Sequence, residues 1–247
     1  MMIYTIPRRK KERGMNVSSG AIYLYRFVFS LRARDTISLS GFPGAAIRGG
    51  FGHALKNSVC LADTRAVSCA PCAFAPSCAY AAVFESPNVG PADIMKKVTH
   101  RPHPFAMAPL FGRSSVFAPG EVFEIEIALF GTGITYLPHF VHAFERLGRM
   151  GLGKGRGKYE LVSVRNAHNN AAVFDGRSGL NCALASPVPL DREGQCDTIV
   201  VEFLTLCRIR RDGSDLRRVS LPAIVGNIVR RYEALCRLYG GSTFSFD

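Results

Sequence analysis

The chain has 247 residues and carries 31 lysines and arginines against 19 aspartates and glutamates, a formal charge of +12. Its 47% hydrophobic and 20% charged residues exclude a disordered or collagen-like protein, and no apolar run approaches the roughly 18–20 residues of a membrane span. At the start of the chain the charges follow the apolar residues, the reverse of a secretory signal. We therefore expect a cytoplasmic protein whose positive charge binds a polyanion, first of all nucleic acid.

The first quarter of the chain predicts a leader, a strand and a helix. Residues 1–19 contain a run of basic side chains and are expected to form a basic flexible leader. Residues 21–31 mix aromatic and β-branched residues, as in a buried strand, and a Gly/Pro turn leads from them to a helix over about 45–59. This helix has an apolar stripe at helical spacing and a contrasting opposite face. The stripe is Ile47, Phe51, Ala54 and Leu55, and the opposite face holds Gly49, His53 and Lys56.

The middle of the chain continues this alternation of strands and helices. Residues 100–110 and 122–130 are typical of strands, the second with clean apolar–polar alternation. A helix is expected over 136–147 and a fourth strand over 158–166. The order strand, helix, strand, strand, helix, strand predicts an α+β fold with a ferredoxin-like βαββαβ domain, the architecture of RNA-recognition modules.

The composition divides the chain into two parts. We expect the ferredoxin-like domain over 20–173, with a cysteine-containing insertion at 60–85. A Gly/Ser/Pro-rich stretch at 174–196 is predicted to be a linker. Residues 197–247 then supply one strand and one amphipathic helix, over 221–239. They predict a second, incomplete ferredoxin-like unit.

A glycine-rich basic segment between the second helix and the fourth strand is the strongest polyanion signal. Glycines let backbone N–H groups approach phosphates, and the basic residues between them supply charge. The segment lacks the pattern of a nucleotide P-loop, so we expect it to bind an RNA backbone. The alternative is a loop with solubilising charge. The candidate residues are Arg149, Gly151, Gly153, Lys154, Gly155, Arg156, Gly157 and Lys158.

Four of the eight cysteines lie close together in the insertion, with the spacing C-x8-C-x2-C-x5-C. Two thiolates separated by two residues can chelate one zinc ion, and two flanking thiolates would complete a tetrahedron. Such a site leaves no open position for catalysis, so the zinc would be structural. The alternative is that the cysteines are small buried hydrophobes. The candidate ligands are Cys60, Cys69, Cys72 and Cys78.

His53 and Lys56 form a candidate catalytic pair on the polar face of the first helix. An imidazole can take a proton from a ribose 2′-OH or give one to a departing 5′ oxygen, and an ammonium can stabilise the charge on the phosphate. The alternative is a solvated surface histidine. The sequence lacks paired acidic residues suited to two-metal phosphoryl transfer. We therefore expect RNA cleavage, if it occurs, to need no cofactor and to leave a 2′,3′-cyclic phosphate.

Four segments in order resemble CRISPR-associated repeat-processing endoribonucleases of the RAMP superfamily. They are IRGGFGHALKNSVC, the C-x2-C…CAYAAVFE run, LFGTGITYLPHFVHAFERLGRMGLGKGRGKYEL, and VEFLTLCRIRRDG…IVRRYEALCRLYGG. The resemblance implies two ferredoxin-like domains, a basic cleft for the repeat hairpin, and metal-independent cleavage of the precursor at the hairpin base. It also implies partners: the CRISPR repeat RNA, which stays bound as the mature guide, and other effector subunits.

The resemblance further implies roles for single residues. His53 occupies the position of the family's first-helix histidine, Lys56 matches a supporting base, and the segment 151–158 matches the RNA-contacting loop. Arginines are the alternative source of catalysis and RNA contacts, here Arg26, Arg34 and Arg48. The chain departs from the family by ending after one strand and one helix of the second unit, which indicates a short variant.

Two other function classes stay open at this point. The first is a non-catalytic RAMP subunit that binds guide RNA and scaffolds an effector complex. The second is a zinc-stabilised ribosome- or DNA-binding protein, which would explain the RAMP-like segments poorly.

Overall fold

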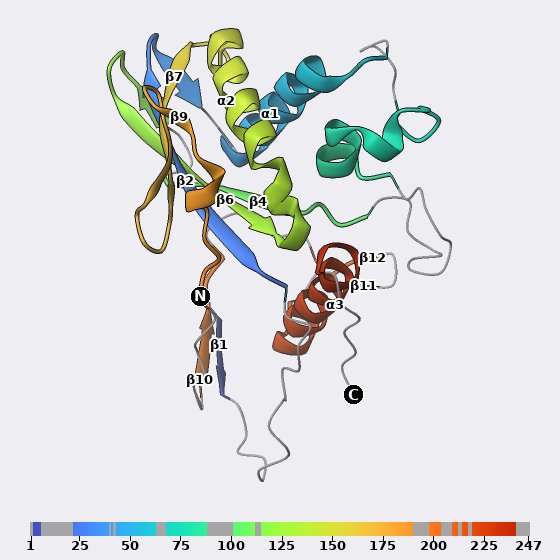
Figure 1. Cartoon of the computed structure of the whole chain (residues 1–247). Helices are drawn as coiled ribbons and strands as arrows, with labels where there is room; N and C mark the ends of the chain where they lie inside the picture. Colours follow the sequence, from blue (N-terminus) through green and yellow to red (C-terminus); the bar gives the residue numbers. More distant parts are fainter. Residues whose placement is uncertain are drawn as a thin grey trace.

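A computed structural model describes most of the chain. The described residues are 2–5, 22–39, 41, 43–62, 68–87, 101–111, 115–189, 198–203, 209–211, 214–216 and 219–240. Two long helices lie side by side on one face of a six-stranded sheet, and a third lies beyond its end (Figure 1). The helices are α1 (Pro43–Val59), α2 (Leu137–Met150) and α3 (Leu221–Tyr239).

The main sheet has the strand order β4-β6-β2-β7-β8-β9, with every neighbouring pair antiparallel. Along the chain its first four strands and two helices follow as β2, α1, β4, β6, α2 and β7. This is the α+β arrangement expected of a ferredoxin-like βαββαβ unit, in which the first two strands are separated by the third. The strands are β2 (Leu24–Ala33), β4 (Phe105–Pro109), β6 (Val122–Phe130), β7 (Tyr159–Asn166), β8 (Ala172–Asp175) and β9 (Gly179–Leu180).

Three two-stranded sheets complete the described strands. One pairs β3 (Ile37–Leu39) with β5 (Ser115–Phe117), beside the start of α1. Another pairs β11 (Arg210–Arg211) with β12 (Ser214–Asp215). The third pairs β1 (Met2–Thr5) with β10 (Thr198–Val201) and so brings the start of the chain beside a segment close to two hundred residues later (Figure 1).

An aromatic cluster fixes the two helices on the sheet. Phe51 of α1 stacks on Phe140 and Phe144 of α2, with ring centroids 4.6 and 5.6 Å apart, and meets the edge of Phe105 on β4 at 5.7 Å. Phe144 in turn contacts Phe29 on the central strand β2 at 5.0 Å. All five rings are buried, so the apolar stripe expected on α1 does face the core.

The opposite face of the sheet carries a ladder of ion pairs. Arg26 on β2 forms a two-armed pair with Glu126 on β6, at 2.8 and 2.7 Å. Arg165 on β7 pairs with Glu124 on β6, across the intervening strand β2. Cross-strand pairs of opposite charge stabilise a sheet and fix its register.

Two of the segments expected to connect or precede domains contain strands. The leader is not entirely loose, because Met2–Thr5 forms β1 and pairs with β10; the rest of the leader, residues 6–19, lies outside the described residues. The stretch predicted as a linker from 174 begins instead with the end of β8, the turn and β9. Val173 and Phe174 are buried, and Asp175 accepts backbone N–H bonds from the turn, including one of 2.8 Å from Arg177. The glycines and serines there shape a hairpin turn.

The helix expected over 221–239 is present with those bounds as α3. Its second half packs on the main domain, where Leu235 and Cys236 are buried against Ile22, and the hydroxyl of Tyr239 donates to the carbonyl of Pro102 at 3.0 Å. The second, incomplete ferredoxin-like unit stays a prediction, because the strand expected from 197 is described only in part.

Replacing Phe51 with alanine is expected to lower the free energy of unfolding by about 3–5 kcal/mol, since it removes a fully buried ring from the centre of the cluster. Denaturant titration followed by circular dichroism measures this change. The control is Val122→Ala, a substitution on a strand residue whose side chain is 51% exposed, which should change stability by less than about 0.5 kcal/mol. Equal effects of the two substitutions would contradict the role given to Phe51.

Candidate nucleic-acid interface

The outer face of α1 is lined by small residues. Ala45, Gly49 and His53 are exposed there, and a Cβ atom added at Gly49 would meet nothing within 4 Å. We call Ala45, Gly49 and His53 the outer strip of α1. At 100° per residue, Ala46 and Gly50 lie on one flank of this strip and Arg48 and Gly52 on the other. The strip therefore leaves room for a large ligand to approach the helix backbone closely.

The glycine-rich segment lies along the first flank. It forms a tight turn closed by a bridge between Leu152 and Gly157. A Cβ atom at Gly153 would come within 2.4 Å of the carbonyl oxygen of Ser38, and one at Gly157 within 2.4 Å of that of Thr36. These glycines thus permit close packing on β3, a role different from the expected approach to phosphates. Of the segment's glycines, Gly155 at the tip has open space around it.

A hollow of about 330 Å³ lies between this turn, β3 and α1. Lys154 and Arg156 come from the turn, and Ala46 and Gly50 from α1. The side chains of Lys154, Arg156 and Lys158 are exposed, as is that of Arg149 at the end of α2. Within the described residues none of these four cations forms an ion pair. They remain available to an anion from outside the chain.

Arg48 lies on the other flank of the strip, between two phenylalanine rings. Its guanidinium is 5.0 Å from the centroid of Phe84 and 4.7 Å from that of Phe105. Burial lowers the pKa of Arg48, and the nearby charge of Arg231 on α3 lowers it further. Two like charges are thus held near each other, and within the described part of the chain no carboxylate pairs with Arg48. Such a pair favours an anionic ligand.

The three predicted catalytic residues are not brought together. His53 is exposed, and its Nε2 lies 3.2 Å from the side-chain amide nitrogen of Asn57. Because that nitrogen only donates, Nε2 accepts, which places the proton of the neutral ring on Nδ1. Lys56 turns the other way, with Nζ 5.5 Å from the ring centroid of Tyr80 in the insertion. Arg48, on the far flank of the helix, is held by its aromatic contacts.

Contrary to expectation, Arg26 lies away from this surface, whereas Arg34 lies beside the glycine-rich turn, where its backbone N–H donates to the carbonyl of Lys158 at 2.8 Å. Arg26 pairs with Glu126 on the face of the sheet opposite the helices, and the hydrogen bond with that carboxylate raises its pKa. Arg34 pairs with Glu160. Each of these two arginines thus already has a carboxylate partner.

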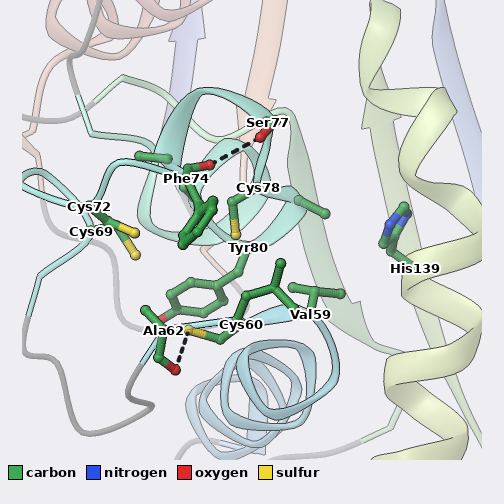
Figure 2. Close-up of a pocket in the computed structure, with 14 residues that line it drawn as sticks. Val59, Cys60, Ala62, Cys69, Cys72, Phe74, Ser77, Cys78, Tyr80 and His139 are labelled. Atoms are coloured by element: carbon green, nitrogen blue, oxygen red, sulfur yellow. Dashed lines mark hydrogen bonds between the residues drawn. The ribbon is translucent and has the colours of Figure 1, made fainter.

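The four cysteines of the insertion line one pocket of about 200 Å³ (Figure 2). Burial, followed by the hydrogen bond and charge of Glu85, raises the pKa of Cys69 to about 12. Within the described residues no three cysteine, histidine or acidic side chains are grouped closely enough to hold a metal ion. The structure thus brings the predicted ligands to one place without placing them in a coordination sphere.

Sequence reasoning missed Arg231 and the two rings that enclose Arg48. Phe84 comes from the insertion, Phe105 from β4 and Arg231 from α3, all far from Arg48 in the chain. The Arg230-Arg231 pair on an amphipathic helix was the available signal, but the position of α3 in the fold was needed to bring Arg231 near Arg48.

Comparison with known proteins places the chain in a family. Residues 22–184 match the family described as AF_1859_N, an N-terminal domain, over more than half of the chain. The chain belongs to the AF_1859_N family. It is also similar to an uncharacterized protein of Archaeoglobus fulgidus, with 29% identity over 210 residues. That alignment covers 82% of this chain and 65% of the relative, so the chain spans slightly less than two thirds of the relative's length.

The family match and the sheet agree on where the domain ends. The matched range includes β8 and β9 and stops at 184, beyond the expected boundary at 173. Across the described parts of this AF_1859_N member, no helix is both long enough and apolar enough to cross a membrane.

Gly153→Ala and Gly155→Ala form a matched pair that tests the packing of the turn. Gly153 has φ of +77° and no room for a Cβ atom, so alanine there should lower the free energy of unfolding by at least about 1–2 kcal/mol. Gly155 has open space, so alanine there should have little effect. Thermal unfolding of the two variants measures the difference. A Gly153→Ala variant as stable as the Gly155→Ala variant would contradict the close approach to β3.

Proposed function

We propose that this chain is a metal-independent endoribonuclease that binds a CRISPR repeat hairpin and cleaves the precursor RNA at its base. It stays bound to the mature guide RNA in an effector complex with other subunits. This work takes place in the cytoplasm and needs no cofactor for catalysis. RNA binding is the part that the geometry supports best, and the cleavage step rests on His53.

The distribution of compensated and uncompensated charge carries the proposal. On the face of the sheet opposite the helices, Arg26 and Arg165 are paired with carboxylates. Around the outer strip of α1, Lys154, Arg156 and Arg48 have no such partner within the described residues. A protein that binds a phosphate backbone needs cations left free for it.

The shape of this surface fits a nucleic-acid strand. Lys154 and Arg156 lie on one flank of the strip, at the hollow beside the glycine-rich turn, and Arg48 lies on the other with Arg231 near it. Between them Ala45 and Gly49 are exposed and carry no large side chain. A strand crossing α1 would thus meet cations on both sides and pass beside His53.

His53 is the residue that we assign to proton transfer. Its Nε2 accepts from Asn57, so in the neutral ring this nitrogen carries the free pair needed to take a proton. RNA binding would have to displace the Asn57 amide before Nε2 reaches a 2′-OH. The 2′-OH proton passes to Nε2 as the 2′-oxygen attacks the phosphorus, the bond to the 5′ oxygen breaks, and that oxygen takes up a proton from solvent. The products are a 2′,3′-cyclic phosphate and a 5′-OH.

One observation favours the non-catalytic RAMP subunit as a second candidate. Lys56, the expected supporting base, contacts Tyr80 and turns toward the insertion. Within the described residues, His53 has only Asn57 as a side-chain partner. A guide-binding scaffold needs the basic surface but not the catalytic pair.

Removing two cations from the turn should weaken RNA binding. Lys154→Ala combined with Arg156→Ala is expected to lower the affinity for a repeat hairpin at least about tenfold, because two charge-assisted contacts are lost. The slope of log affinity against log salt should flatten by about 0.7–0.9 per lost contact. Filter binding at several salt concentrations measures both.

The control removes the same charge elsewhere, with Arg177→Ala and Arg237→Ala. Arg177 lies in the turn between β8 and β9 and Arg237 on α3, and both are exposed. If the two double variants lose affinity equally, binding follows net charge and the turn has no special role.

His53→Ala should abolish cleavage of a labelled repeat hairpin in EDTA and leave its binding unchanged within about twofold. The loss of a general acid or base typically costs about 10²–10⁴ in rate. Gel analysis with phosphatase treatment identifies the cyclic phosphate. His168→Ala, in the exposed turn after β7, is the matched histidine control.

Binding by the wild-type chain without any cleavage would replace the endoribonuclease with the scaffold subunit. Cleavage that persists in His53→Ala would move the chemistry to other residues.

A further inference from the structure

We propose that the insertion binds one structural zinc ion through the thiolates of Cys60, Cys69, Cys72 and Cys78. The zinc would fix the insertion against the end of α1. A zinc ion held by four thiolates has no open position for substrate, so its role would be structural.

The stretch 69–78 of the insertion buries little apolar surface. From 69 to 78 the backbone runs through successive tight turns, with Cys72 N–H donating to Cys69, Ala75 to Cys72, and Cys78 to Ala75. Most side chains of this stretch are exposed, including Phe74 at 53%. Ordering such a segment costs conformational entropy that small segments commonly offset with a metal or disulfides.

The cysteines are placed as ligands would be. Cys60 follows the last turn of α1, and the other three come from the insertion, so one ion would join the two elements. Cys69 and Cys72 lie together at one side of the pocket in Figure 2, with Cys78 and Cys60 on its other walls. Cys60, Cys72 and Cys78 are only partly buried. Cys69 belongs to the hydrophobic core, and Cys72 and Cys78 pack against it, so the ligand role rests on the one pocket that all four cysteines line.

A backbone hydrogen bond holds the loop between two of the proposed ligands in place. The carboxylate of Glu85 accepts the backbone N–H of Cys69 at 2.7 Å, which orients the loop that carries two of the ligands.

A coordination sphere forms only if the thiols move closer together, because within the described residues no three such side chains are grouped closely enough to hold a metal ion. The Cys60 thiol now points toward the carbonyl of Ala62, with sulfur and oxygen 3.6 Å apart, a weak interaction that rotation would break. Each Zn–S bond forms as its thiol releases a proton to solvent. Tetrahedral ligation by four sulfurs selects zinc or iron among common metals, and no redox partner is required for zinc.

The zinc site would also support the RNA surface. Ala82, at the start of the segment Ala81–Glu85, donates its N–H to the carbonyl of Cys78 at 2.9 Å. This segment carries Phe84, whose ring packs on Arg48 and against Phe51 of α1. A metal that fixes Cys78 would thus also hold Phe84, one of the two rings that enclose the Arg48 guanidinium.

The test uses the full chain without RNA, so its result is separate from that of the proposed function. The chain is produced in zinc-supplemented medium, and metal is measured by mass spectrometry and by release with a mercurial reagent. We expect one zinc ion per chain, lost in Cys69→Ser combined with Cys72→Ser and retained in Cys182→Ser, an exposed cysteine outside the insertion.

A second measurement covers the case in which the double variant fails to fold. Cobalt substituted into the wild-type chain should give the charge-transfer absorption of a tetrahedral tetrathiolate centre. A wild-type chain without bound zinc, zinc that survives the loss of Cys69 and Cys72, or bound iron in its place would overturn the proposal.

Discussion

The packing of one aromatic ring determines how this domain presents its surface. Phe51 lies among Phe84, Phe105, Phe140 and Phe144, and so ties α1 to α2, to β4 and to the insertion at once. With that side of the helix buried, the residues left outside are small ones and His53. Arg48 is held between two rings of the same cluster. The core packing therefore generates the candidate interface.

Glycines contribute to this surface mainly by letting backbones approach one another. Gly153 and Gly157 have no room for a side chain against β3, and Gly52 has none against Phe84. These contacts hold the turn 151–158 beside α1 and leave Lys154 and Arg156 at its tip. The segment was identified from its composition as a phosphate-binding loop. Most of its glycines instead permit close packing, and we propose the polyanion role for the basic residues between them.

Features set by local pattern were predictable, and features set by distant contacts were not. The alternation in Val122–Phe130 and the apolar stripes of the three helices predicted the correct elements, because the spacing of apolar residues along a strand or helix determines which of its faces is buried. The pairing of β1 with β10 and of Arg26 with Glu126 joins residues about a hundred or more positions apart, which no local pattern encodes. Lys56 was placed on the correct side of α1, but the insertion folds back and engages it through Tyr80.

Photo-crosslinking of a repeat hairpin carrying 4-thiouridine, with the attachment sites mapped by mass spectrometry, tests the central claim most directly. The account predicts crosslinks to α1 near Gly49 and His53, to the turn at 154–156, and to the side of α1 that carries Arg48. Crosslinks concentrated instead on the face with the paired Arg26 and Arg165, or spread evenly over the basic surface, would contradict it.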